Sequence, residues 1–315
     1  MKATTKKKLI AAVLVLITVL GAAALAYQPL LKWYRKVAKL PDENGMYQVG
    51  EHWFQVLEPL SDQSAQKFAD KLLSIQENYL TDENQVFWAV VPDKGWYAKD
   101  AGYPTFDHAT FQKELESLLP HFTAIDLTDS LSLDNYYQSD RHWRQETLQP
   151  VLDKLGSMMG FSVELNQFTP HEFSPFHGDF SKNITGELPE ESLVYLSNND
   201  TESAIVDNYQ AKDVHTVYDL PRLESKLPYD MFLSGVTPIV TINNVNSKTE
   251  KELVIFRDSF ASSLAPLLCG EYRTITLIDL RFMHSSLIPE HITFTNQDVL
   301  FLYSDWIASN STLLR

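Results

Sequence analysis

Apolar and polar positions follow helix and strand periods in turn along the first half of this chain. Apolar residues recur every three or four positions from Ala65 to Ile75 and from Phe111 to Leu118, which is the spacing of a helix with one buried face. Largely apolar runs from Gln85 to Val91 and from Phe122 to Leu127 predict strands. Strands that alternate with helices predict an α/β fold built on an open, mostly parallel sheet with helices on both faces.

The same alternation returns in the second half. The pattern from Gln145 to Met159 predicts a helix, with Gly160 at its end. Leu253 to Phe256 is a short continuous apolar run, which is typical of a strand buried on both faces. Ser262 to Leu268 follows it and reads as helix.

The segment from Phe161 to Tyr218 interrupts this order. It is polar and predicts β-hairpins or long loops inserted over the sheet edge. Such an insert either shapes a substrate groove or is a solvated excursion with no ligand, and the sequence leaves both open. Its histidines, His171, His177 and His215, lack the spacing of metal ligands and are predicted to be ordinary surface residues.

The N-terminus carries the features of a membrane anchor. Residues 1–8 hold four lysines and precede a largely apolar run from Leu9 to Ala26, about the shortest length that spans a bilayer as a helix. Lysines before the run predict a cytoplasmic start and an extracytoplasmic remainder. We expect a single-pass cell-membrane protein, and the alternative is secretion after cleavage near Ala26, where Ala24-Leu25-Ala26 has a signal-peptidase pattern.

A short stalk and one domain are predicted to follow this segment. Residues 27–44 contain Trp33 and Tyr34 beside Lys32 and other cations, which suits a membrane interface, although a stalk leading into the domain would look the same. Residues 45–315 are long enough for one core and show no repeat or low-complexity linker.

Charge and cysteine content narrow the function. Residues 1–36 hold seven Lys or Arg and no acid, which leaves 19 basic and 41 acidic residues and a net charge of −22 for the rest of the chain. That sign disfavours nucleic acid binding. Cys269, the single cysteine, cannot form an internal disulfide and is read as a small core residue. We expect no metal and no cofactor.

Three residues have the chemistry of a serine hydrolase or acyltransferase. A serine hydroxyl is a weak nucleophile, so a histidine must take its proton, and a carboxylate must hold that histidine in the right tautomer. Asp140 and His142 are two residues apart, and on an extended segment or tight turn both point to one side. Ser259 comes directly after the apolar strand, at the carboxyl edge of the predicted sheet, where ligands bind.

Each of these residues also has an ordinary interpretation. Asp258-Ser259 after a strand is most often a helix N-cap, since both side chains accept hydrogen bonds from helix N–H groups. The Asp140-Arg141-His142-Trp143 stretch, taken alone, is more often a surface turn.

Four stretches of the chain carry a family resemblance. The sequence resembles the DHHW family of exported bacterial proteins, which is related to the SGNH-like acetyltransferases of alginate and other exopolysaccharides. The resemblance extends over residues 45 to 315, and the similarity is weaker at Gly45-Met46-Tyr47 and Val91-Pro92-Asp93-Lys94. The stretches that carry it are Tyr136 to Trp143, Tyr229 to Gly235, Leu253 to Pro266, and Ile278 to Arg281.

The resemblance implies a fold and a set of roles. The fold would be an SGNH-hydrolase-like, flavodoxin-like three-layer sandwich with an inserted loop and β region. Asp140, His142 and Ser259 would form the triad. Arg141 stands where the family has its second histidine, which leaves the triad intact.

A second departure concerns the oxyanion site. The family's Phe-Leu-Gly-Gly-Asn reads Phe232-Leu233-Ser234-Gly235-Val236 here, so the asparagine amide is missing. The backbone N–H groups of Ser259 and Gly235 are then the predicted oxyanion donors. Loss of one such donor costs about a hundred- to a thousandfold in turnover.

Three further residues beside the motifs are predicted to bind substrate. Tyr137 and Trp143 could present flat faces to sugar rings, and Arg257 could pair with a substrate carboxylate. Aromatic residues at such places are core more often than ligand platform, and Arg257 could equally pair with Asp258.

The leading hypothesis is an exported, membrane-anchored O-acetyltransferase or carbohydrate esterase. By the resemblance, it would act on a cell-surface polysaccharide and receive its acyl group through a membrane-bound O-acyltransferase. The alternatives are a catalytically impaired glycan-binding or assembly protein on the same scaffold, and a plain structural surface protein.

Overall fold

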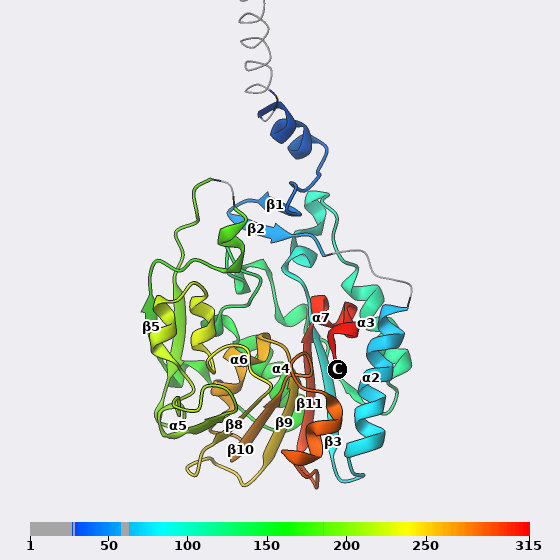
Figure 1. Cartoon of the computed structure of the whole chain (residues 1–315), viewed down its shortest axis with the longest axis vertical. Coiled ribbons are helices and arrows are strands. Elements are labelled where there is room, and N and C mark those ends of the chain that lie inside the picture. Colours follow the sequence, from blue (N-terminus) through cyan, green and yellow to red (C-terminus); the bar gives the residue numbers. More distant parts are fainter. Residues whose placement is uncertain (1–26, 28, 58–62, 185) are drawn as a thin grey trace, which may run out of the picture.

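A seven-stranded sheet lies at the centre of the computed structural model, which describes residues 27, 29–57, 63–184 and 186–315 (Figure 1). Its strand order is β4-β3-β11-β9-β10-β8-β7. The first five strands run parallel, while β8 is antiparallel to β10 and β7 is antiparallel to β8. The strands are β3 (Gln85–Val91), β4 (Thr123–Ala124), β7 (Ile205–Asn208), β8 (Ile239–Asn243), β9 (Glu252–Arg257), β10 (Thr274–Ile278) and β11 (Asp298–Ser304).

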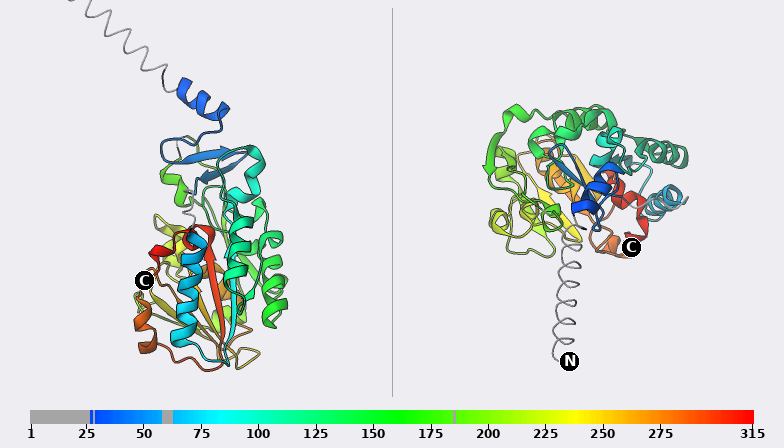
Figure 2. Two further views of the ribbon diagram at one scale, coloured as in Figure 1. Left: turned by 90° about the vertical axis from the view of Figure 1, so that its right-hand side faces the viewer. Right: turned by 90° about the horizontal axis from the view of Figure 1, so that it is seen from above.

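Helices cover both faces of this sheet, so the predicted mixed α/β fold with a central sheet is confirmed (Figures 1 and 2). In β3, Trp88 and Val90 join the buried cluster that contains the apolar sides of α2, α3 and α7. Phe87 and Ala89 point the other way, into the cluster that contains α4 and α6. The helices are α2 (Ser64–Tyr79), α3 (His108–Leu118), α4 (Gln149–Met159), α5 (Asn199–Ser203), α6 (Phe260–Leu264) and α7 (Asp305–Ser309).

One predicted strand is much shorter than expected. The prediction covered Phe122 to Leu127, and only Thr123–Ala124 pairs with β3. The Asp126 carboxylate accepts a hydrogen bond from the N–H of Thr128 at 2.8 Å and turns the chain into a 3-10 helix. Ile125 and Leu127 therefore pack in the core although the strand has already ended at Ala124.

Two small sheets flank the main one. The insert forms a hairpin of β5 (Thr169–Phe173) and β6 (Leu193–Ser197), and its last part adds β7 to the edge of the central sheet. A second hairpin, β1 (Met46–Val49) and β2 (His52–Gln55), lies beyond the carboxyl ends of the parallel strands (Figure 1). Both hairpins are thus additions to the central sheet and its covering helices.

The predicted cytoplasmic start (residues 1–8) and transmembrane segment (residues 9–26) lie outside the described residues. Among the helices that the structure does describe, none is long and apolar enough to cross a bilayer. Residues 29–37 are helical and stand beyond the β1–β2 hairpin at one end of the molecule (Figure 2, left).

Candidate functional site

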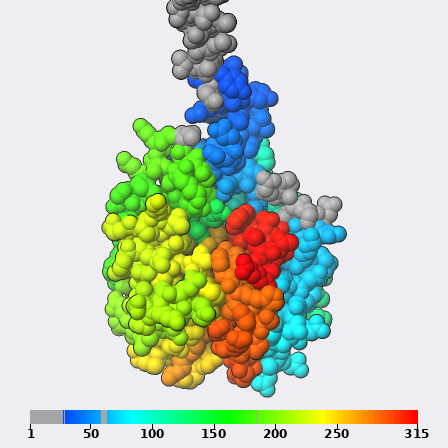
Figure 3. Space-filling view, in the orientation of Figure 1, coloured from blue at the N-terminus to red at the C-terminus, as the bar shows by residue number. Residues whose placement is uncertain are grey.

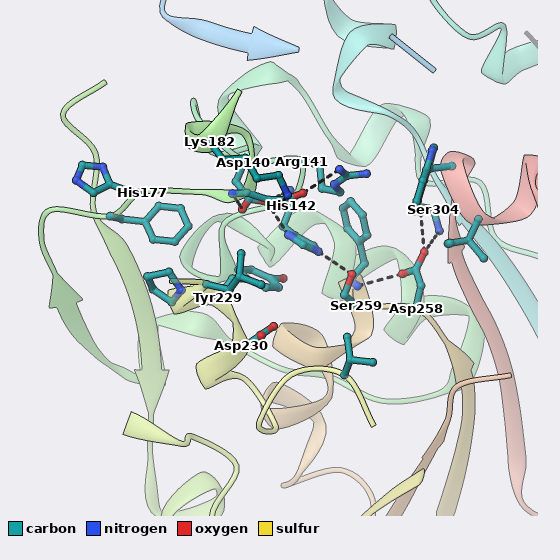
Figure 4. A pocket seen from close by; sticks show the side chains of 18 of the residues that line it. Asp140, Arg141, His142, His177, Lys182, Tyr229, Asp230, Asp258, Ser259 and Ser304 are labelled. Atoms are coloured by element: carbon teal, nitrogen blue, oxygen red, sulfur yellow. Dashed lines mark hydrogen bonds and ion pairs between the residues drawn. The ribbon is translucent and has the colours of Figure 1, made fainter. Parts of the chain in front are cut away.

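Asp140, His142 and Ser259 come together at the carboxyl edge of the central sheet (Figure 4). The Nε2 atom of His142 lies 2.7 Å from the Ser259 hydroxyl oxygen, and its Nδ1 atom lies 2.6 Å from Oδ1 of Asp140. An ionised carboxylate can only accept, so Nδ1–H donates to Asp140. Nε2 is then left to accept the Ser259 hydroxyl proton, which is the geometry that a serine nucleophile requires.

The turn around Ser259 decides between its two interpretations. Ser259 is the N-cap residue of α6, but its side chain makes no capping hydrogen bond. The capping role belongs to Asp258, whose Oδ1 accepts from the Phe260 N–H at 3.0 Å. Oδ2 of Asp258 accepts from the N–H and the hydroxyl of Ser304, at 2.7 and 2.6 Å, which ties the ends of β9 and β11 together. Asp258 therefore holds the turn, and the Ser259 hydroxyl is free to face His142.

Asp140 is buried and held by amide donors on both oxygens. Oδ1 also accepts from the His142 N–H at 2.8 Å, and Oδ2 accepts from the Asp179 N–H at 2.7 Å. Burial by itself would raise the pKa of Asp140, but the charge of His142 and these hydrogen bonds hold that pKa well below its usual range. Asp140 is therefore a carboxylate at neutral pH.

The insert reaches this carboxylate through a glycine. A Cβ atom on Gly178 would lie 2.4 Å from the Asp140 Cβ and 2.5 Å from the Ser139 carbonyl oxygen, so a larger residue does not fit there. The Gly178 N–H donates to the Ser139 hydroxyl at 2.9 Å, and that hydroxyl also bonds Glu191. The polar insert thus fixes the Asp140 segment from outside, which sequence patterning did not indicate.

A buried lysine holds the same segment from inside. The Lys94 ammonium donates to the carbonyl oxygens of Tyr137, Gln138 and Asp140, at 2.6, 3.3 and 2.9 Å. Burial lowers its pKa to about 8, against the opposing charges of nearby carboxylates. In the sequence, Lys94 stands out only as the last residue of a stretch with weak similarity to the family. Nothing there indicates that it binds the carbonyl groups of the Asp140 segment.

Lys94→Met is expected to lower the free energy of unfolding by about 2 kcal/mol or more, because it leaves buried carbonyl groups without a donor. Urea denaturation at neutral pH measures this change. Lys154→Met, at an exposed position on α4, is the matched control and should change stability little. Equal midpoints for the two variants would contradict the role assigned to Lys94.

Tyr229 lies flat against His142. The two ring centroids are 3.9 Å apart with an interplanar angle of 10°, and the Tyr229 hydroxyl bonds the Ser263 hydroxyl at 2.8 Å. The Trp143 indole N–H donates to the same Ser263 hydroxyl at 2.9 Å. Ser263 of α6 therefore anchors both aromatic residues next to His142.

The three predicted substrate-binding residues are all buried, and that prediction is wrong for each of them. Tyr137 and Arg257 are at most 1 % exposed and Trp143 is fully buried. None of the three lines the cavity beside Ser259. Arg257 faces the core because alternate side chains of a fully buried strand point to opposite faces, and its guanidinium donates to the Ser262 hydroxyl at 2.7 Å.

The Gly235 amide, predicted as an oxyanion donor, is already hydrogen-bonded in the structure, and its role as a donor stays a prediction. Its N–H donates to the Phe232 carbonyl oxygen at 3.1 Å and so closes a turn. Leu233, Ser234 and Gly235 all have positive φ, at 55°, 60° and 77°. The Ser259 N–H lies at the start of α6, and its role as a donor stays a prediction.

A cavity of about 380 Å³ opens beside the Ser259 hydroxyl (Figure 4). Four of its lining residues come from the insert, which favours the groove-shaping interpretation of that segment. Arg141 lines it as well, pairs with Asp179 at 2.9 Å and lies 4.9 Å from the Trp306 ring centre. The lining residues that the sequence did not identify include His177, Asp179, Lys182, Asp230 and Trp306.

Among the insert histidines, only His177 lines this cavity within the described residues. His171 stacks on Tyr195 with ring centroids 4.7 Å apart, and the His215 ring lies 3.1 Å from the Val206 carbonyl oxygen. These local contacts agree with their prediction as ordinary histidines.

Comparison with solved structures identifies proteins of similar fold. The chain matches a DHHW family protein from Eubacterium siraeum with a TM-score of 0.67 and 18 % identity, over 86 % of this chain and 94 % of that one. It matches PatB1 of Bacillus cereus, solved with a sulfonyl adduct, with a TM-score of 0.61 and 18 % identity, over 86 % and 96 % of the two chains. No protein-family model and no curated protein sequence matches the chain. The resemblance inferred from the sequence is therefore confirmed at the level of the fold.

Proposed function

We propose that this chain is an exported, membrane-anchored O-acetyltransferase or carbohydrate esterase of the SGNH-hydrolase type. The observation that carries the proposal is the hydrogen-bonded series from Asp140 through His142 to Ser259, set beside a cavity. The family resemblance supports a cell-surface polysaccharide as acceptor and a membrane-bound O-acyltransferase as the source of the acyl group.

The reaction has two halves that mirror each other. The Ser259 oxygen attacks the acyl carbonyl carbon while His142 Nε2 takes the hydroxyl proton. The carbonyl oxygen gains the negative charge, and collapse of this intermediate breaks the bond to the donor, which leaves with the proton from His142. A sugar hydroxyl or water then gives its proton to His142 and attacks the acyl-enzyme, and Ser259 leaves with that proton from His142.

Two features of the site support these steps. Asp140 remains ionised and so favours the imidazolium that forms when His142 accepts a proton. The Ser259 N–H at the first turn of α6 lies where a helix N-terminus attracts negative charge.

A sulfonyl fluoride and a chromogenic acetyl ester test the proposal together. The adduct on the PatB1 neighbour makes sulfonyl reagents the natural probe. We expect ester turnover by the full chain, a sulfonyl label on Ser259 by mass spectrometry, and loss of both in Ser259→Ala. A label on any other residue with Ser259 unmodified would contradict the proposal.

One observation favours a second function, a glycan-binding protein without turnover. The Phe232-Leu233-Ser234-Gly235-Val236 turn has no asparagine, and its Gly235 amide is already bonded. This alternative predicts glycan binding that His142→Ala leaves unchanged, together with no label and no ester turnover by the natural chain.

Tyr229 is proposed as a positioning residue for His142. Tyr229→Leu removes the stacked ring and is expected to lower kcat by up to about tenfold, since such ring pairs contribute about 0.5–1.5 kcal/mol. Tyr229→Phe keeps the ring and should keep most of kcat. The pH dependence of kcat separates positioning from a folding defect, because loss of the stack changes the surroundings of the imidazolium.

Tyr209→Leu, at an exposed tyrosine, is the control and should match the natural chain. The positioning role is refuted if Tyr229→Leu retains both the natural kcat and the natural pH profile.

A further inference from the structure

The helix at residues 29–37 exposes an apolar stripe. Four of its side chains follow the i, i+3, i+4, i+7 spacing and so share one face. They are exposed large hydrophobic residues, namely Leu30 (63 %), Trp33 (62 %), Tyr34 (54 %) and Val37 (62 %). In the space-filling view this helix projects from the body of the molecule (Figure 3).

The domain gives this helix little support. Within residues 29–37, only Leu31 and Arg35 are half-buried, and the other side chains are exposed. Helices shorter than about 12–15 residues are marginal in water unless an apolar face is packed against something. The stripe therefore requires a further surface to cover it.

The charge of the segment specifies that surface. Lys32 and Lys36 lie one turn apart on the side away from the stripe, and Arg35 and Lys39 add two more cations. No acidic residue occurs between residues 27 and 41, although the chain beyond residue 36 is strongly acidic. A helix with an apolar face that contains Trp and a basic opposite face lies in the plane of a membrane interface. Basic groups at that depth are attracted to anionic lipids.

We infer that residues 29–37 lie in the headgroup region of a phospholipid bilayer that contains anionic lipid. The stripe of Leu30, Trp33, Tyr34 and Val37 faces the acyl chains, and Lys32 and Lys36 face the headgroups. The inference rests on the proposed membrane attachment through residues 9–26, which end just before this helix, and is independent of any role for Ser259.

This arrangement orients the candidate site. The β1–β2 hairpin that follows the helix contacts the Asp140 loop, with the Trp53 N–H donating to the Gln138 carbonyl oxygen at 2.9 Å. The side-chain carbonyl of Gln55 accepts from Arg141 at 3.1 Å. The carboxyl edge of the sheet therefore faces the end of the molecule that carries the helix (Figures 1 and 2). An interfacial helix would turn that end toward the bilayer.

Site-directed fluorescence on the full chain in vesicles tests the inference. Cys269 is 1 % exposed and is the single cysteine, so the natural chain provides an unlabelled background. Tyr34→Cys on the stripe and Lys36→Cys on the basic face are each labelled with the environment-sensitive dye NBD. The vesicles contain phosphatidylcholine with phosphatidylglycerol, and some carry a lipid with a nitroxide quencher on its acyl chain.

The expected result is a blue-shifted emission that the nitroxide lipid quenches for Tyr34→Cys, and neither effect for Lys36→Cys. Replacing phosphatidylglycerol by phosphatidylcholine should weaken the quenching. Equal quenching at both positions, as in a spanning helix, would overturn the inference, as would water-like emission at both. A blue shift at Tyr34→Cys that follows protein density without lipid quenching would indicate a second copy instead and would equally overturn it. Since no outcome depends on turnover, failure here and failure of the proposed activity are distinguishable.

Discussion

Ser259→Ala is expected to reduce acyl transfer and ester hydrolysis on the order of 10⁴-fold or more, because the reaction then loses its nucleophile. The structure predicts little effect on the fold. The Ser259 hydroxyl makes no capping hydrogen bond to α6, and Asp258 retains its bonds to Phe260 and Ser304. We expect the free energy of unfolding to change by about 1 kcal/mol or less. Turnover of a chromogenic acetyl ester and urea denaturation of the same preparation measure both quantities.

Ser286→Ala, which removes an exposed hydroxyl far along the chain from this turn, is the matched control and should retain full activity. An active Ser259→Ala variant would show that another group carries the acyl chain. A variant that is inactive and also unfolded would contradict the structural role described for Asp258.

The triad geometry was predictable because its signals are local. Asp140 and His142 stand two residues apart, so a turn suffices to pair them, and Ser259 directly follows a buried strand whose end lies at the sheet edge. Only their meeting across 117 residues depended on the fold. The central sheet was predictable for the same reason, since the apolar runs of β3 and β9 record burial on both faces.

The walls of the site were not predictable, because they depend on tertiary packing. Asp179 and Lys182 belong to a polar insert whose sequence carries no period, and they reach the cavity only because Gly178 allows close approach to Asp140. Trp306 comes from the short helix after β11. Nothing in the sequence around these residues distinguishes them from residues of an ordinary surface segment.

The misassigned residues have a different cause. Tyr137 and Arg257 lie within three residues of Asp140 and Ser259 along the chain, yet both side chains are buried in the core. Sequence proximity to a motif is therefore weak evidence for contact with substrate. Whether a residue can contact substrate depends on its own burial, whereas the sequence predicts burial only for a strand as a whole.

Asp140→Asn is expected to lower kcat by about 10⁴-fold, because it removes control over the His142 tautomer. All three groups that contact the Asp140 carboxylate from His142 and Asp179 are N–H donors. An asparagine offers one accepting oxygen and one donating NH₂. With the NH₂ toward His142, Nδ1 must accept, so the proton moves to Nε2, which can then no longer accept from Ser259. With the NH₂ toward Asp179, two donors face each other and the loop is destabilised.

The pH dependence of stability gives a second measurement of the same substitution. The pKa of Asp140 is lowered by folding, so the stability it contributes is complete above the unfolded-state pKa of about 3.9 and is lost as the pH falls through the lower folded-state value. The natural chain should therefore exceed Asp140→Asn in stability at neutral pH, and the gap should narrow in acid. Asp153→Asn, at an exposed carboxylate on α4, should show no such gap and full activity. A pH-independent gap, or an Asp140→Asn variant with natural kcat, would show that Asp140 serves packing alone and does not orient His142.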